Sequence, residues 1–272
     1  MFRLDLRLSL RIVARGLLLP VVLAVLVGCT ALPAPIDSVN AVDEVGAIDE
    51  VTQISTYPAL ERGLYDGDVT YAQLAQAGNF GIGTFDGMDG EMMALDGQFY
   101  QARADGSVRR ADQTLETPFA TVTFFTAEQR VPTAEPLASY DQLKAYLASV
   151  APPSNRPYAI RIDGSFPYLK IRSVPRQSEP YPPLADVVAE QVTWERKDMR
   201  GTLVGYWFPE YLSALVAPGY HLHFISDDRQ VAGHLLDCSL DGATIAIDYL
   251  DQVTLRIPQT AAFAAADFST KP

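Results

Sequence analysis

Basic side chains are scarce in this sequence. The 272 residues hold 21 lysines and arginines against 33 aspartates and glutamates, which gives a formal net charge of -12. Such a charge repels phosphate backbones and anionic lipid headgroups through space. We therefore expect no nucleic-acid partner.

Cysteine is rarer still, with only Cys29 and Cys238. Cys29 closes the stretch LVGC, which follows four arginines in the first 15 residues and the apolar run from Leu17 to Val27. This order is typical of an export signal, and the run is too short to span a bilayer comfortably. LVGC resembles a bacterial lipobox, in which cleavage precedes a cysteine that receives lipid.

The pattern predicts a lipoprotein-type signal peptide over residues 1–28 and an exported bacterial protein that Cys29 anchors at the cell envelope. A membrane is then a partner only through this lipid. Lipidation of Cys29 leaves Cys238 without a disulfide partner inside the chain. The alternative is an ordinary signal peptide with a cysteine at this place by chance.

A dinucleotide-binding loop is also missing. The glycines in GNFGIGTFDG, residues 78–87, do not fit the spacing G-x-G-x-x-G, and the chain has no internal repeat. Neither a nicotinamide enzyme of the Rossmann type nor a repeat protein is expected.

The sequence does contain enough apolar residues, 48%, to bury a core, and its 13 tyrosines and 12 phenylalanines favour sheet. Residues 29–56 combine small and acidic residues with two prolines and have no regular period, so they predict a disordered tether. The stretch APPSN then separates an N-terminal α/β subdomain, residues 57–153, from a C-terminal β-rich subdomain, residues 154–272. We expect an α/β (α+β) fold of two β-rich subdomains with mixed sheets and a few short helices.

Local patterns place several elements. Thr70 is the expected N-cap of a short helix, and Ser139 with Gln142 forms a capping-box pattern before a longer one. Asp-Gly pairs at residues 96–97 and 105–106 predict hairpin turns between strands.

A third Asp-Gly pair, Asp163-Gly164, is expected to join two strands of alternating pattern in YAIRIDGSFPYLKIRSVPRQ. One face should hold Ile160, Ile162, Leu169 and Ile171, and the other face Arg161 and Arg172. After the short helix YPPLADVVAEQ the chain offers five strand candidates: TLVGYWF, YHLHFI, GHLLDCSL, ATIAIDY and VTLRI.

All three histidines lie in the stretch PGYHLHFISDDRQVAGHLLD. His221 and His223 are one residue apart on an expected strand, so both imidazoles project from one face with Cα atoms roughly 6.5–7 Å apart. The polar run SDDRQVAG can turn the chain, and His234 on the returning strand can then supply a third nitrogen. Three neutral imidazoles leave coordination positions open, as in catalytic zinc sites. The sequence therefore predicts a metal site on a strand pair of the C-terminal subdomain.

Two other interpretations of this cluster stay open. Three histidines on a half-exposed hairpin can simply be solvated. H-x-H with a later histidine also occurs in cupins, although a cupin usually has a glutamate a few residues after H-x-H and its last histidine a whole strand pair later, neither of which is present here.

The order of several longer motifs resembles that of the alpha-acetolactate decarboxylase family, over nearly all of residues 57–268. The motifs are GNFGIGTFDGMDGEMMALDGQFYQARADGSVR, TPFATVTFF, YAIRIDGSFPYLKIRSVPRQ, PYPPL, GTLVGYWFPEY and PGYHLHFISDDRQVAGHLLD. The resemblance implies a homodimeric enzyme of two subdomains that converts 2-acetolactate, a 2-hydroxy-3-oxo acid, to acetoin and CO₂ with a catalytic Zn²⁺, although another divalent metal could serve.

The resemblance also assigns residues. His221, His223 and His234 match the three metal ligands of the family. Glu91, in DGEMMALDG, matches its catalytic glutamate, and Arg172, in KIRSVPRQ, its active-site arginine, while Thr84, in GTFDG, matches a position near the substrate.

The chemistry suits these residue types. Loss of CO₂ leaves electrons that must flow into the neighbouring ketone oxygen as an enediolate, and a bound zinc is the Lewis acid that accepts them. Arg172 can orient the substrate carboxylate, whereas Glu91 is either a fourth metal ligand or an acid/base for the hydroxyl.

Two other function classes remain as alternatives: a cupin-like metal-dependent oxygenase or isomerase, and a non-enzymatic metal-binding lipoprotein. One departure from the family is also visible, because the family places a second glutamate in a C-terminal tail and this sequence has no glutamate after Glu210. We expect slower or less stereoselective proton delivery for that reason.

Overall fold

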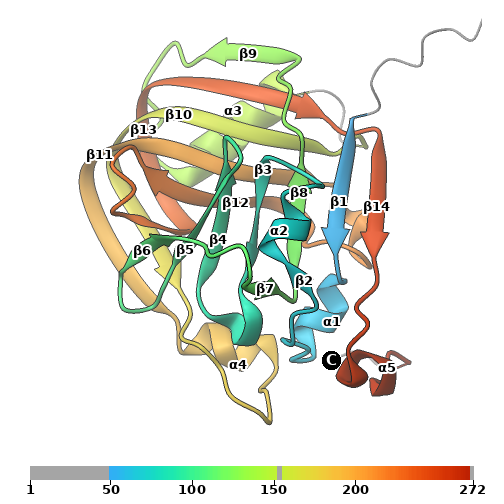
Figure 1. Cartoon of the computed structure of the whole chain (residues 1–272). Helices are drawn as coiled ribbons and strands as arrows, with labels where there is room; N and C mark the ends of the chain where they lie inside the picture. Colours follow the sequence, from blue (N-terminus) through green and yellow to red (C-terminus); the bar gives the residue numbers. More distant parts are fainter. Residues whose placement is uncertain (1–48, 152–154, 270–272) are drawn as a thin grey trace, which may run out of the picture. The chain divides into compact units, whose positions relative to one another are not determined.

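The computed structural model describes residues 49–151 and 155–269, all within one compact unit, Val45–Pro272 (Figure 1). The expected signal peptide and the lipidated Cys29 lie outside the described residues and stay predictions. Across those two ranges, no helix combines the length and the apolar character that crossing a membrane requires.

The expected tether is wrong from Glu50 onward. Strand β1 (Glu50–Ile54) pairs parallel with β14 (Gln252–Arg256) and antiparallel with β8 (Ala120–Thr123). Its side chains Val51 and Ile54 are buried, and so is Gln53, whose Oε1 accepts a hydrogen bond from Thr121 Oγ1 over 2.6 Å. A polar residue on the buried side breaks the simple alternation that marks a strand in a sequence.

The first sheet has seven strands in the order β14-β1-β8-β3-β4-β5-β6. Its remaining strands are β3 (Phe80–Thr84), β4 (Glu91–Leu95), β5 (Gln98–Ala102) and β6 (Val108–Arg110). The Asp96-Gly97 and Asp105-Gly106 turns lie where the sequence predicts them, between β4 and β5 and between β5 and β6. Asp96 and Gly97 both have positive φ, 51° and 76°, which is why a two-residue hairpin turn favours this pair.

Short elements surround this sheet. They are α1 (Tyr57–Glu61), α2 (Tyr71–Leu74), the 3₁₀ turn η1 (Asp86–Met88) and the small pair β2 (Val69–Thr70) with β7 (Glu116–Thr117). Thr70 caps α2 as predicted, and its capping box with Gln73 is complete.

The second sheet is built from four long strands that close on themselves. Its order is β10-β11-β12-β13-β9, with β10 also paired to β13. The bounds are β9 (Gln129–Pro132), β10 (Tyr158–Ser173), β11 (Val192–Phe208), β12 (Gly219–Ser226) and β13 (Ala232–Tyr249).

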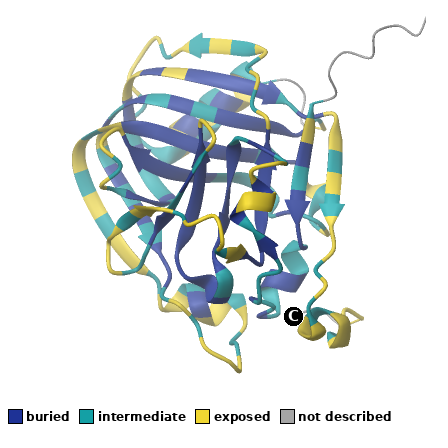
Figure 2. Cartoon of the chain, in the orientation of Figure 1, coloured by how far each residue is buried: buried dark blue, intermediate teal, exposed yellow. Residues whose placement is uncertain are grey.

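The interior of this closed sheet holds a large apolar core. Figure 2 shows long stretches of its strands coloured as buried. Helix α3 (Tyr140–Val150) adds the fully buried Leu143 and Leu147 to that core, and Ser139 caps the helix as predicted by accepting a hydrogen bond from Gln142 N–H. The remaining elements are α4 (Leu184–Ala189), the 3₁₀ turn η2 (Glu210–Leu212) and α5 (Ala261–Ala265).

The turn expected at Asp163-Gly164 is wrong, because β10 runs through this pair without reversing. Asp163 is held inside the sheet by Arg161 Nε at 2.8 Å and by Thr202 Oγ1 at 2.7 Å. A Cβ atom at Gly164 would lie 2.7 Å from the Cβ of Ala243. The glycine is therefore required because β10 and β13 approach each other closely here, and not because the chain turns.

The predicted faces of β10 are nevertheless confirmed. Ile160, Ile162, Leu169 and Ile171 all lie in the core of the closed sheet, and register shifts between residues 163 and 171 change the alternation between the two pairs. The candidates GHLLDCSL and ATIAIDY are likewise one continuous strand, β13, rather than two.

The two sheets do not follow a single cut in the sequence. The boundary expected at residues 153–154 lies within residues 152–154, outside the described residues, so the division into two subdomains stays a prediction. Strand β9, before that point, belongs to the second sheet, and β14, after it, belongs to the first.

A buried carboxylate on β13 provides a test of the fold. Asp248 is 0% exposed; its Oδ2 accepts a hydrogen bond from Thr126 N–H over 2.9 Å, and its Oδ1 has no partner within the described residues. Burial raises the pKa of Asp248 to about 6, and Asp49 and Glu128 add to the rise, although the Thr126 hydrogen bond and Arg156 oppose it. The pKa of Asp248 is about 4 in the unfolded chain and about 6 in the folded one. The folded state is therefore most stable, as far as this group is concerned, below pH 4, and this stability is lost as pH rises through about 6.

We expect Asp248→Asn to raise the free energy of unfolding at pH 8 by roughly 1–3 kcal/mol, because no charge is then buried. Below about pH 4 the gain should vanish, since Asp248 is then neutral in both states. Urea unfolding at the two pH values measures the difference, with the exposed Asp241→Asn on the same strand as control. An equal effect at both pH values would contradict the assignment.

Candidate metal centre and its cavity

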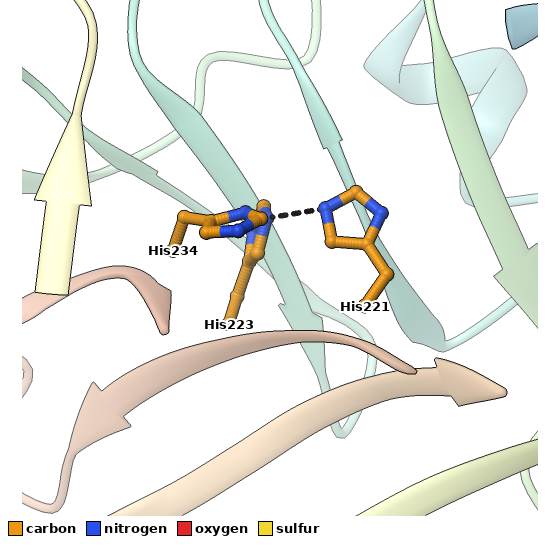
Figure 3. Close-up of side chains that lie close together, drawn as sticks. All are labelled: His221, His223 and His234. Carbon is orange, nitrogen blue, oxygen red and sulfur yellow. Dashed lines mark hydrogen bonds between the residues drawn. The ribbon is translucent and has the colours of Figure 1, made fainter. Parts of the chain in front are cut away.

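The three histidines meet where β12 and β13 pair. His221 and His223 lie on one face of β12, and His223 is the register partner of His234 on β13. The Nε2 atoms of His221 and His223 are 3.2 Å apart, and Nδ1 of His234 is 3.3 Å from Nε2 of His223. Figure 3 shows the three rings turned toward one point, which confirms the convergence expected from H-x-H and a returning strand.

All three imidazoles are neutral in this environment. Burial, followed by the charge of Arg172, lowers the pKa of His221 to about 3. Burial also holds the pKa values of His223 and His234 well below their usual range. A neutral imidazole with a free lone pair is the form that binds metal ions.

A backbone carbonyl fixes the tautomer of His223. Its Nδ1 lies 2.9 Å from the carbonyl oxygen of Met92, which can only accept, so Nδ1 carries the proton. The lone pair of Nε2 then points toward His221 and His234. Metal-binding histidines commonly use such a partner to fix their orientation.

The spacing of the nitrogens fits a tetrahedral metal ion. Zinc binds imidazole nitrogen at roughly 2.0–2.1 Å, so two nitrogens on one tetrahedral zinc lie roughly 3.3 Å apart. The two observed separations, 3.2 and 3.3 Å, match this value. His221, His223 and His234 could therefore hold such an ion as a group.

A carboxylate from the first sheet faces the same point. Glu91, the first residue of β4, is 6% exposed, and its Oε2 lies 3.5 Å from His223 Nε2. Its Oε1 accepts a hydrogen bond from Arg172 Nη1 on β10 over 3.2 Å. Burial raises the pKa of Glu91, while Arg172 acts in the opposite direction.

Three of these residues form one cross-strand row. Arg172 on β10 is the register partner of His234 on β13, which is in turn the partner of His223 on β12. Adjacent strands thus carry a guanidinium and two imidazoles on the same side of the sheet, opposite Glu91 of β4.

Thr84, the last residue of β3, is the register partner of Glu91. It is 3% exposed, and its hydroxyl donates to the carbonyl oxygen of Gly90 over 2.7 Å. The hydroxyl proton is therefore engaged with the backbone that leads into Glu91.

The sequence-predicted residues all line one cavity of about 330 Å³. Its polar side holds Thr84, Glu91, Arg172 and the three histidines. Its apolar side is formed by Tyr57, Leu60, Met88, Phe119, Leu184, Val188, Ala217 and Pro218.

Sequence reasoning missed this apolar side. Its residues come from α1, η1, the link between β7 and β8, α4 and the loop before β12, which are far apart along the chain. Met88, Phe119, Leu184 and Pro218 do lie in the family motifs, but an apolar residue is an ordinary core residue from the sequence alone, so nothing marked them as cavity residues.

Comparison with known proteins gives one consistent family. Residues 51–270 match the family described as alpha-acetolactate decarboxylase. A protein of that name from Methylococcus capsulatus is 42% identical over 217 residues, which cover 80% of this chain and 83% of that protein. One from Methanosarcina mazei is 43% identical over 215 residues, covering 79% and 74% of the two chains.

The fold is similar to solved structures as well. The crystal structure of alpha-acetolactate decarboxylase from Bacillus subtilis strain 168 superposes with a TM-score of 0.79 at 36% identity and covers 82% of this chain and 94% of that one. A Staphylococcus aureus protein of unknown function, similar to that enzyme, gives a TM-score of 0.78 at 30% identity and covers 80% and 94%. The strand-rich α/β class predicted from the sequence is confirmed.

Proposed function

Because this chain belongs to the alpha-acetolactate decarboxylase family, we propose that it is a carboxy-lyase that converts 2-acetolactate to acetoin and CO₂ with a metal ion at its three histidines. The observation that carries the proposal is the meeting of Glu91, Arg172 and the three histidines in one cavity. These groups come from both sheets, and together they offer what the reaction requires.

The proposed ion is zinc, held by His221, His223 and His234. When bound, it supplies a Lewis acid that accepts the electron pair released as CO₂ leaves. The separations of the three nitrogens and their neutral state support this choice.

Arg172 is proposed to bind the carboxylate of the substrate. A guanidinium has five N–H donors, and Arg172 uses Nη1 for Glu91, so donors remain for a second carboxylate. Its side chain is 14% exposed, which places the charge at the cavity wall in a largely dehydrated environment. An arginine there orients the bond between the carboxylate and the carbon that loses it. Once the carboxylate has become neutral CO₂, its attraction to the guanidinium is lost and the product can leave.

Glu91 is proposed to carry the proton. The carbon that loses CO₂ already bears the hydroxyl, and it must gain one proton to become the CH(OH) carbon of acetoin. A glutamate whose pKa burial raises can hold a proton on Oε2 and deliver it inside the cavity.

The apolar side of the cavity suits the rest of the substrate. Leu60, Met88 and Val188 offer surfaces for its two methyl groups and exclude water from the breaking bond.

The other function classes are less well supported. A non-enzymatic metal-binding protein has no need of the buried ion pair between Glu91 and Arg172, and a cupin-like oxygenase would be expected to match a different family. Assembly as a homodimer stays a prediction.

Removal of the metal tests the function directly. We expect a fragment that starts at residue 45 to release CO₂ and acetoin from 2-acetolactate under anaerobic conditions, to lose this activity in a chelator, and to regain it with Zn²⁺. Acetoin assay and elemental analysis on the same samples measure both properties. Full activity in a metal-free preparation, or a requirement for O₂, would overturn the proposal.

A further inference from the structure

Glu91 enters β4 from a tight loop, residues 85–90, and the shape of this loop sets the position of its carboxylate. Asp89 has φ -74° and ψ 68°, the values of an inverse γ-turn, and Gly90 N–H donates to the Met88 carbonyl over 2.8 Å. Gly90 has φ 85°, and a Cβ atom there would run into the carbonyl oxygen of Ala102. The approach to Glu91 is therefore narrowly defined.

A buried glutamine outside the histidine cavity binds the backbone of this loop. Gln101 on β5 is 1% exposed, and its Nε2 donates to the carbonyl oxygen of Asp89 over 2.5 Å. Its Oε1 accepts from Nε of Arg109 on β6 over 2.8 Å. Because Arg109 can only donate and a carbonyl can only accept, the amide of Gln101 has one possible orientation.

We propose that Gln101 is a positioning residue for Glu91, with Arg109 fixing the orientation of its amide. Gln101 is not among the residues that line the cavity, so it acts through the backbone of Asp89 and Gly90. The inference rests on the proposed function, in which Glu91 carries the proton.

Two further contacts, which do not involve Gln101, hold the same segment. The Thr84 hydroxyl donates to the Gly90 carbonyl over 2.7 Å, and Arg103 Nε lies 3.2 Å from Asp89 Oδ1. Because these contacts do not involve Gln101, we expect its loss to shift Glu91 rather than to unfold β4. A small shift of a proton-transferring group is enough to slow the chemical step.

The variant Gln101→Met tests the proposal, since methionine keeps the buried volume and removes both hydrogen bonds. We expect kcat to fall about 10- to 100-fold, with KM changed by less than about twofold. The zinc content should equal that of the wild type, because all three histidines lie on the other sheet. An unchanged kcat would overturn the proposal.

The double variant with Glu91→Gln separates positioning from a general structural role. If Gln101 acts through Glu91, adding Gln101→Met to Glu91→Gln should lower kcat no further. An equal fold-loss in both backgrounds would show that Gln101 acts elsewhere and would also overturn the proposal.

The exposed Arg109 provides a second route if Gln101→Met does not fold. Arg109→Gln should lower kcat a few-fold, again only when Glu91 is present, whereas Arg110→Gln, its exposed neighbour on β6, should change nothing. If Arg109→Gln leaves kcat unchanged, the proposal that Arg109 and Gln101 together position Glu91 is overturned. Inactivity of the wild type on 2-acetolactate would instead refute the proposed function, so the two failures are distinguishable.

Discussion

Replacement of His223 by alanine is expected to remove the metal ion and the activity together. His223 contacts both other histidines, with its Nε2 3.2 Å from His221 Nε2 and 3.3 Å from His234 Nδ1, and it is 1% exposed. Two imidazoles bind zinc far less tightly than three, and the Met92 carbonyl loses its hydrogen-bond partner as well. Because the ion contributes several kcal/mol to the reaction, activity should fall by more than about 10³-fold.

Elemental analysis and an acetoin assay of the purified variant measure the two losses. The matched control is Gln230→Ala, an exposed residue in the turn between β12 and β13, which should keep both metal and rate. A His223→Ala protein that holds one zinc per chain would contradict the assignment of this residue as a ligand.

Glu91→Gln is expected to separate metal binding from turnover. Glutamine has nearly the same size and can still contact Arg172, but it cannot carry the proton. We expect the three histidines to hold much of the zinc while kcat falls about 10²- to 10⁴-fold, the usual range for a missing acid/base group.

The rate should be compared at saturating substrate with that of Glu116→Gln, an exposed carboxylate on β7 that should behave as wild type. Loss of zinc in parallel with rate would identify Glu91 as a fourth ligand instead. Unchanged turnover would remove Glu91 from the mechanism.

The metal site could be predicted from the sequence because its signal is local. His221, His223 and His234 lie within 14 residues of one another, on two strands joined by a polar turn, and the period of a strand decides which way they point. No tertiary information is required for such an inference.

Glu91 and Arg172 could not be placed at this site by pattern alone. They lie 81 residues apart and on different sheets, and only the family resemblance connected them before the structure was known. Residues whose meeting depends on how two sheets pack leave no local mark in a sequence.

The wrong predictions, a turn at Asp163-Gly164 and a disordered tether over β1, also arise from contacts with residues distant in the sequence. Asp163-Gly164 has the composition of a hairpin turn, but the contact that requires Gly164 is with Ala243, far along the chain. Strand β1 was hidden because its buried Gln53 has a partner, Thr121, on another strand. A local rule fails where a distant neighbour gives a residue a different reason to be there.

The cross-strand row of Arg172, His234 and His223 limits which insertions and deletions the gene can tolerate. One residue added to β13 just before His234 would turn that side chain into the apolar core, where its neighbour Leu235 now packs, and would place the added residue at the metal site instead. The same holds for β10, where the irregular pairings before Arg172 decide the side on which it emerges. Length changes in this lineage should therefore be confined to the connections between these strands.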